Sequence, residues 1–340
     1  MKKIICLVLS LCFVFALAAC GGSSAPAATA APAAPAEAPA EAPAELPADE
    51  SFVVGICQLV QHPALDAATE GFKQALTDAL GDSVRFIEQN ASGDSAACAT
   101  ICNQFVSEEV DLIMANATPA LQAAAAATNQ IPVLATSITD FGSALGIDDW
   151  TGVTGMNISG TSDLAPLDGQ AQIARDLFPE AKSVGVLFCS GEANSLFQAD
   201  TIQPLFEALG FMVSRFTFSD SNDVAAVTET ACGACDLLYI PTDDTAASCA
   251  EAINNVALNA GVPIVCGEEN LCKGCGVATL SIDYFDLGFA CGEMAVEILS
   301  GGADVSSMEV RFAPQFTKEF DADRCAALGI TPPDDFVAIA

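Results

Sequence analysis

Residues 52–79 read FVVGICQLVQHPALDAATEGFKQALTDA, a strand-like run followed by a helix-like one. The run at 52–56 is apolar and rich in β-branched residues, as in a strand buried on both faces. Pro63 suits the first turn of a helix. One apolar face at helical spacing then comes from Leu65, Ala68, Phe72, Leu76 and Ala79. A buried strand leading into an amphipathic helix is the repeating unit of a parallel α/β sheet.

The same unit recurs along the chain in two series. The first predicts strands at 84–87, 112–115 and 132–135, a helix from about residue 94 with Ala97, Ile101 and Phe105 inward, and a helix at 119–128. The second predicts strands at 184–188, 212–218, 237–240, 263–266 and 277–282, and helices at 195–209, 224–231 and 245–260. Two such series predict an α/β protein of two Rossmann-like lobes with parallel sheets.

The N-terminus has the order of a secretory signal. Lys2 and Lys3 precede an apolar run at 4–19, which is shorter than the roughly 20 residues of a membrane-spanning helix. Leu-Ala-Ala-Cys at 17–20 resembles the lipobox of bacterial lipoproteins. That resemblance implies a signal peptide at 1–19, cleavage before Cys20, and a lipid on the Cys20 thiol that anchors an extracytoplasmic protein to the cell membrane. An ordinary cleaved signal that ends in cysteine is the alternative.

The segment that follows differs sharply in composition from the rest. Residues 23–50 are almost entirely Ala, Pro, Glu and Ser, with Leu46 as the one large aliphatic residue. Such a segment buries too little apolar area to offset its chain entropy. We therefore expect residues 20–51 to form a disordered linker behind the lipid anchor.

The net charge of the chain limits the classes of molecule that it can bind. It has 11 Lys and Arg against 44 Asp and Glu, a formal net charge of −33. A surface this acidic repels nucleic acid and anionic lipid, and it favours cations and zwitterions over anions.

Polar residues follow the predicted strands, where open parallel sheets bind ligands. These segments are 57–62, 116–118 and 136–140 in the first lobe, and 190–195, 242–245 and 268–270 in the second. A helix N-terminus can hold a carboxylate, while Asp or Glu from a neighbouring loop faces an ammonium. The pattern indicates an amino-acid zwitterion site. The same residues are also ordinary helix caps and turn formers, which is the alternative reading.

Several longer stretches resemble one known family. VGICQLVQHPALDAATEGFKQAL at 54–76, DLIMANATPALQAAAAAT at 111–128 and ATLSIDYFDLGFACGEMAVEIL at 278–299 are similar to ABC-transporter substrate-binding lipoproteins of the tryptophan/tyrosine-type group, and the likeness covers 52–330. The resemblance implies a type I periplasmic-binding-protein fold with three hinge crossings, lobe 1 at 52–158 and 284–306, and lobe 2 at 159–283 and 307–340. It further implies a monomer without cofactor or enzymatic activity, which closes on a small ligand, an aromatic amino acid above all, and delivers it to an ABC permease and its ATPase.

Carried over residue by residue, the resemblance implies ligand-binding positions at Gln58, His62, Asn116, Thr118, Thr136, Asp140, Thr161, Ser162, Asp163, Glu192, Asn194, Ser195, Thr242, Asp243 and Asp283. Ser162, Asn194 and Ser195 are the candidates for a carboxylate; Asp243, Asp163 or Glu192 are those for an ammonium. The family usually has Asn where this chain has Asp244. That carboxylate either attracts cationic groups or caps the next helix, and we favour the cap. His62, the sole histidine, either faces the ligand or only forms the turn before Pro63.

No catalytic or metal-binding motif stands out. One histidine excludes a His-rich metal site, and no G-x-S-x-G, G-x-G-x-x-G or Walker pattern follows a strand. Of the 15 cysteines, Cys6 and Cys12 leave with the signal and Cys20 is lipidated. Two CxxC pairs, Cys232/Cys235 and Cys272/Cys275, are open to three readings: buried thiols, disulfides or a metal site. The four-residue spacing of Cys98 and Cys102 places both in the core.

Other functions remain compatible with these patterns. The same lobes would serve a lipid-anchored sensory receptor, and the CxxC pairs leave room for a protein that handles metals or thiols. Within the leading interpretation, a branched-chain amino acid, a small peptide or a nucleoside are further ligand classes.

Overall fold

The computed structural model describes residues 51–313 and 315–339. The predicted signal peptide, Cys20 and the linker up to residue 50 lie outside the described residues. Within the described ranges, every helix is too short or too polar to cross a membrane.

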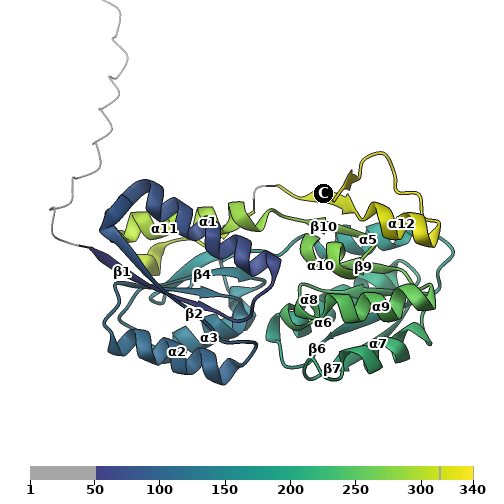
Figure 1. The fold of residues 1–340 in the computed structure, drawn as a ribbon, viewed down its shortest axis with the longest axis horizontal. Coiled ribbons are helices and arrows are strands. Elements are labelled where there is room, and N and C mark those ends of the chain that lie inside the picture. The colour runs from purple at the N-terminus through teal and green to yellow at the C-terminus, as the bar shows by residue number, and fades with distance from the viewer. Residues whose placement is uncertain (1–50, 314, 340) are drawn as a thin grey trace, which may run out of the picture. The chain divides into compact units, whose positions relative to one another are not determined.

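The first sheet has six strands, all parallel (Figure 1). Its strand order is β11-β5-β4-β3-β1-β2. The strands are β1 (Phe52–Gln58), β2 (Val84–Asn90), β3 (Leu112–Asn116), β4 (Val133–Ile138), β5 (Ile158–Ser162) and β11 (Arg311–Phe312). Helices α2 (Ser95–Ser107) and α3 (Thr118–Ala127) pack on one face, and α1 (Pro63–Leu80) and α11 (Tyr284–Leu299) pack on the other. The short α4 (Phe141–Leu145) follows β4.

The second sheet has seven strands in the order β13-β12-β10-β9-β8-β6-β7. They are β6 (Ser183–Cys189), β7 (Met212–Phe218), β8 (Leu237–Ile240), β9 (Ile264–Cys266), β10 (Ala278–Ser281), β12 (Thr317–Phe320) and β13 (Val337–Ala338). One pairing, β10 with β12, is antiparallel. One face carries α5 (Leu167–Leu177), α6 (Ala193–Ala208) and α12 (Ala322–Leu328); the other carries α7 (Val224–Cys232), α8 (Asp244–Ser248), α9 (Ala250–Ala260) and α10 (Glu269–Cys275).

The chain passes between the two sheets three times, after β5, after β10 and after β11. These passes agree with the three crossings implied by the family resemblance, but their positions differ. The strand β5 extends the first sheet to Ser162, and β11 adds residues 311–312 to it, beyond the expected boundaries at 158 and 306. The reason is that Ser-Gly-Thr-Ser at 159–162 lacks the apolar residues typical of a strand, and pairing with β4 holds it in place.

Most local predictions agree with the structure. Helix α1 begins at Pro63 and buries the predicted face, except that Ala79 is exposed, because Leu80 is the residue of the last turn that packs inward. The helix expected at 245–260 is interrupted at Cys249 and forms α8 and α9. Helices α5 and α10 have no counterpart in the sequence-based prediction. Cys98 and Cys102 are fully buried, as expected.

The cysteines in the described ranges are free thiols, and most are buried. In the same ranges no group of three or more His, Cys, Asp or Glu side chains has the geometry to hold a metal ion. Both CxxC pairs pack into the core between the second sheet and α7 to α10.

Candidate functional site

The predicted site residues gather where the carboxyl ends of the two sheets face each other. Two of the fifteen are half-buried, Asp140 and Thr242, and Asp283 is exposed. The others are buried: Gln58, His62, Asn116, Thr118, Thr136, Thr161, Ser162, Asp163, Glu192, Asn194, Ser195 and Asp243. These side chains follow separate strands of both sheets, which is where the strand-end rule predicts a site.

A narrow, enclosed cavity of about 10 Å³, the room of about one water, lies between the lobes. It is lined by His62, Ala64, Leu65, Asp163, Thr242, Asp243, Asp244, Ala247, Glu268 and Tyr284. A wider space of about 350 Å³ adjoins it, because Asp244 lines both. Leu59, Val60 and Pro119 form apolar parts of that outer space. Four carboxyl groups and one imidazole thus surround the narrow cavity, and the outer space beside it has the size of a small-molecule site.

The lobes touch directly beside this cavity. Nε2 of His62, ahead of α1, lies 3.1 Å from Oδ1 of Asp244 on α8. Nε2 of Gln198 on α6 donates to Oγ1 of Thr139 at 3.5 Å. The cap role that we favoured for Asp244 is wrong, because the side chain that caps α8 is Asp243. Asp244 instead pairs with a histidine 182 positions away.

Two carboxylates of the cavity wall, Asp243 and Glu268, and Glu192 beside the outer space accept hydrogen bonds from backbone amides of the second lobe. Asp243 accepts from the Ala246 N–H at 2.7 Å and from the Cys189 N–H at 2.6 Å. Glu192 accepts from the N–H groups of Asp244 and Thr245 at 3.0 and 2.9 Å. Glu268 caps α10, accepting from the Asn270 and Leu271 N–H groups. These carboxylates neutralise the N-termini of α8 and α10 from within the protein.

Asp163 is committed differently. Its Oδ2 accepts from the Tyr284 hydroxyl at 2.9 Å, whereas its buried Oδ1 has no hydrogen-bond partner among the described residues. Nine buried side-chain atoms in the same ranges have no partner, and five of them belong to predicted site residues: Asp163 Oδ1, His62 Nδ1, Asn116 Oδ1, Thr118 Oγ1 and Asn194 Oδ1. Unpaired buried polar atoms are costly. The five atoms of the predicted site are therefore available to bind a polar molecule.

Burial dominates the electrostatics of this region. It raises the pKa of Asp163 and of Asp243 to about 6 each and that of Glu268 to about 7, and it raises the pKa of Glu192 as well. Burial lowers the pKa of His62, but the hydrogen bond and charge of Asp244, with the charges of Glu268 and Asp66, outweigh it. The net effect is a His62 pKa above its ordinary value, which favours the imidazolium.

Several predicted residues serve the scaffold around the cavity. The hydroxyls of Thr136 and Thr161 bond to each other at 2.9 Å, and Ser162 donates to the Thr139 carbonyl. Gln58 bonds to Asp66 and Thr69 on α1. The two helix caps, Asp140 on α4 and Asp283 on α11, do not line the cavity.

Sequence reasoning missed other lining residues. Glu268 belonged to a segment that follows a strand, and Tyr284 opens the helix after β10, so position relative to a strand was an available signal for both. Ala64 and Leu65 carried no such signal, because they line the cavity as the first turn of α1.

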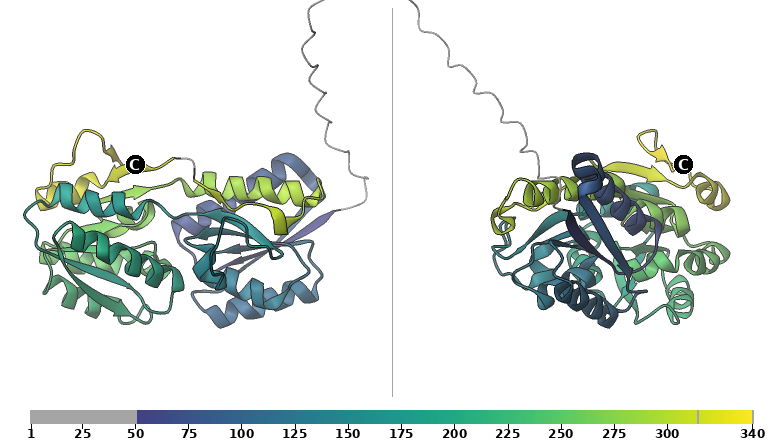
Figure 2. Two further views of the ribbon diagram at one scale, coloured as in Figure 1. Left: turned by 180° about the vertical axis from the view of Figure 1, so that it is seen from behind. Right: turned by 60° about the vertical axis from the view of Figure 1, so that its left-hand side comes forward.

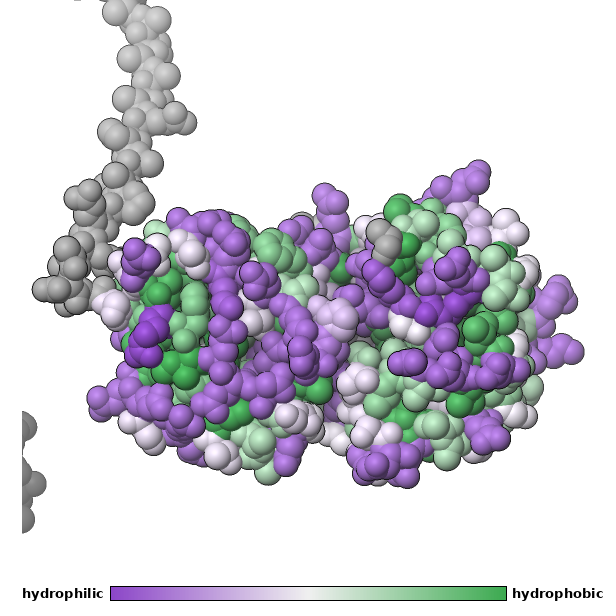
Figure 3. Space-filling view, in the orientation of Figure 1, coloured by the Kyte–Doolittle hydropathy of each residue, from purple (hydrophilic) through white to green (hydrophobic). Residues whose placement is uncertain are grey.

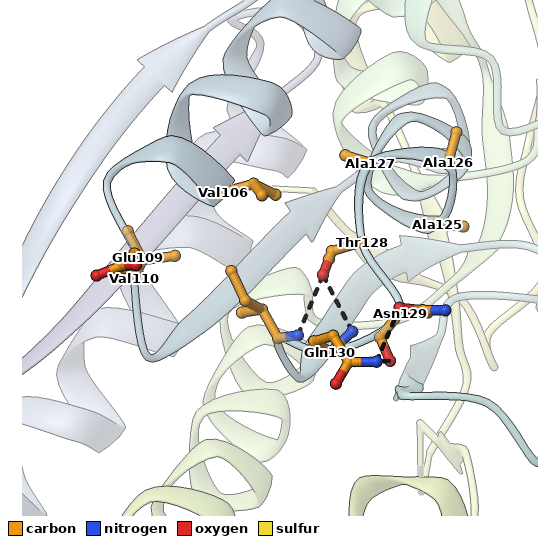
Figure 4. Close-up of a pocket in the computed structure, with 10 residues that line it drawn as sticks. Val106, Glu109, Val110, Ala125, Ala126, Ala127, Thr128, Asn129 and Gln130 are labelled. Atoms are coloured by element: carbon orange, nitrogen blue, oxygen red, sulfur yellow. Dashed lines mark hydrogen bonds between the residues drawn. The ribbon is translucent and has the colours of Figure 1, made fainter.

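A second hollow lies far from this site, at the opposite ends of the first-sheet strands (Figure 4). It is lined by residues at the ends of α2 and α3. In its loop, Thr128 Oγ1 accepts from the N–H groups of Gln130 and Ile131. Every polar group drawn with a bond there serves the turn that leads into β4, so the hollow is a consequence of the loop's shape.

The family model for ABC transporter substrate-binding proteins matches residues 53–340. The chain belongs to this family. A Clostridioides difficile relative, named tyrosine-binding protein, is 37% identical to this substrate-binding protein over 73% of the chain and 72% of its own length.

Two solved structures of similar proteins identify the fold. The Streptococcus pneumonia ABC domain in complex with L-Trp superposes with a TM-score of 0.80 at 30% identity, covering 84% of this chain and 97% of that one. The ligand-free, open structure of a Clostridium difficile substrate-binding protein with adhesive properties gives 0.65 at 34% identity, covering 85% and 99%. This substrate-binding protein therefore has the type I periplasmic-binding-protein fold that its sequence predicts.

Proposed function

We infer that this substrate-binding protein captures a free amino acid between its lobes and delivers it to an ABC permease driven by an ATPase. The observation that carries this proposal is the enclosed cavity whose wall holds an unpartnered carboxylate oxygen, on Asp163, and an unpartnered imidazole nitrogen, on His62. A zwitterion brings a cationic and an anionic group of its own, so it can satisfy both atoms at once.

The space next to the narrow cavity favours a single amino acid. Its volume of about 350 Å³ lies at the lower end of the range for small-molecule sites. A side chain can extend toward Leu59, Val60 and Pro119 in the adjoining space. An aromatic ring suits these apolar walls, and the tyrosine-binding relative and the L-Trp complex support the same choice.

The comparison structures also support capture by closure. The chain superposes better on the L-Trp complex than on the open, ligand-free relative, although its sequence is more similar to the latter. This order supports a lobe arrangement in this chain that is nearer to that of the ligand complex than to that of the open relative. A ligand favours the closed form only through contacts with both lobes, and the cavity wall contains residues of both.

A panel of the twenty amino acids in a thermal-shift assay tests the ligand. We expect L-tyrosine, L-tryptophan or L-phenylalanine to give the largest shift, since ligand at 100 times its Kd adds about 2.7 kcal/mol. Small-angle scattering with the same ligand should show a smaller radius of gyration. A panel without any response would refute the amino-acid ligand, and an unchanged radius would refute closure.

Attachment is a separate part of the proposal. We place the mature protein outside the cytoplasm as a monomer, held to the membrane by a lipid on Cys20 and spaced from it by the linker. Replacing Cys20 with Ser should prevent lipidation and leave an uncut precursor or a released product. If the variant stayed on the membrane with the wild-type mass, the lipoprotein assignment would be wrong.

A further inference from the structure

The N-terminus of α1 opens onto the cavity and is not capped by a side chain. His62 occupies the cap position without a capping hydrogen bond, and Pro63, the next residue, has no N–H group. The first helical bond runs from Asp66 N–H to the His62 carbonyl, so the N–H groups of Ala64 and Leu65 have no acceptor within the helix. Both residues line the cavity.

The second ring nitrogen of His62, Nδ1, is also available at this cavity. The His62 side chain is 5% exposed and lines the cavity. A carboxylate only accepts hydrogen bonds, so Nε2, which is 3.1 Å from Asp244, carries a proton. Nδ1 has no partner among the described residues. It therefore offers an N–H donor to the cavity whenever the ring is charged.

The acidic groups around the ring keep it charged. Asp244 on α8, Glu268 at the start of α10 and Asp66 in the first turn of α1 act on it, and Asp163 shares the cavity wall. No Lys or Arg lines the cavity in the described part of the chain. The cationic ring and the uncapped helix end thus form its electropositive side.

We propose that the N-terminus of α1 and Nδ1 of His62 together bind the carboxylate of the ligand, while Oδ1 of Asp163 binds its ammonium. This proposal rests on the proposed function. It replaces the assignment of the carboxylate to Ser162, Asn194 and Ser195. Ser162 donates to the Thr139 carbonyl, and Asn194 donates to the Thr242 carbonyl at 3.0 Å.

One rival anion site exists at the N-terminus of α3. Its cap residue, Ala117, makes no capping hydrogen bond, and the buried Thr118 Oγ1 has no partner in the described ranges. Thr118 does not line the enclosed cavity with Asp163, and its hydroxyl carries no charge. The α1 site therefore fits a zwitterion better, and Thr118→Val separates the two.

Three matched ligands test the proposal on the purified mature chain: L-tyrosine, tyramine without the carboxylate, and 3-(4-hydroxyphenyl)propionate without the ammonium. Wild type should bind L-tyrosine roughly 10- to 100-fold more tightly than tyramine, the usual effect of one charged hydrogen bond. His62→Gln should remove that preference and leave tyramine binding unchanged. Asp163→Asn should remove the preference over the propionate.

Two controls keep the result interpretable. Asp140→Asn makes the same change at a helix cap outside the cavity and should alter neither preference. Asp244→Asn keeps an acceptor beside Nε2 but removes its charge, so the preference over tyramine should persist at pH 6 and weaken at pH 8. If His62→Gln does not fold, Asp244→Asn tests the role of the charged ring in its place.

The proposal is overturned if His62→Gln retains the full preference for L-tyrosine over tyramine, or if Thr118→Val abolishes it instead. A failure of the α1 site and a failure of the proposed function give different results. Binding of L-tyrosine that is indifferent to His62 refutes the α1 site alone, whereas a protein that binds no amino acid refutes the proposed function and the site with it.

Discussion

Residues of one chemical type have different roles around the cavity because their oxygen atoms have different partners. Both oxygens of Asp243 accept backbone N–H groups, one from α8 and one from the end of β6. Asp163 uses one oxygen to accept from Tyr284 and leaves the other at the cavity wall. Asp243 is therefore a scaffold residue, and Asp163 is the ligand candidate.

Asparagine at these two positions should separate fold from binding. In Asp243→Asn the amide group would face the Cys189 N–H, donor against donor, so we expect a loss of roughly 1–3 kcal/mol in the free energy of unfolding. Asp163→Asn removes a charge that is costly to bury, so its stability at pH 7 should equal or exceed that of wild type. Urea unfolding measures both. A stable Asp243→Asn protein would contradict the scaffold role.

The affinity for L-tyrosine should have a maximum near neutral pH. Asp163 must be ionised to hold an ammonium, and burial raises its pKa to about 6, so affinity falls below that pH. His62 must be protonated, and its pKa is raised, so affinity also falls as pH rises through that higher value. Titration calorimetry from pH 4.5 to 9 measures the profile. Asp163→Asn should lose the acid limb, and a flat wild-type profile would exclude both assignments.

The packing of helices α1 and α11 sets the geometry of the site. α1 and α11 lie side by side over the first sheet (Figures 1 and 2). The approach is close enough that a Cβ on Gly288 would lie 1.9 Å from the Ala68 carbonyl oxygen. Because α1 presents its N-terminus to the cavity and α11 begins with Tyr284, this packing fixes the carboxylate donors relative to Asp163.

Gly288→Ala should therefore damage both stability and binding. The added methyl group meets backbone that cannot move aside as a side chain would, and we expect a cost of about 1–3 kcal/mol or more. L-tyrosine affinity should fall as well, since α1 and α11 must separate. Gly233→Ala at the end of α7 is the control, because its nearest neighbour would lie at 3.5 Å. Equal denaturation midpoints for the two variants would contradict the close-packing argument.

At the level of the whole molecule, the buried titratable groups together determine how stability depends on pH. The face drawn in Figure 3 has many hydrophilic residues with hydrophobic patches between them. The ionisable groups around the cavity, in contrast, are buried, and Asp163, Asp243, Glu192, Glu268 and His62 all have raised pKa values. The folded state therefore binds protons that the unfolded state releases.

The ligand-free protein should become more stable as pH falls from 8 to 5. A raised pKa contributes stability below the unfolded value that is lost as pH rises through the folded value, and all five groups act in this direction. Urea unfolding at four pH values checks the slope. Glu268→Gln, at the group with pKa about 7, should flatten it most between pH 6 and 8. Stability that increases with pH over this range would contradict the shifted pKa values.

Local sequence patterns were enough to predict the two α/β lobes, the face that α1 buries, and the polar residues at strand ends. Each depends on residues within a few positions of one another, through periodicity and turn preferences. Three features could be seen only in the folded chain: β5 and β11 extend the first sheet, Asp243 caps α8, and Asp244 contacts His62 across the lobes. These outcomes depend on burial and on contacts between distant segments. The sequence does not distinguish a carboxylate whose oxygens accept hydrogen bonds from backbone amides from one whose oxygens are free to bind a ligand.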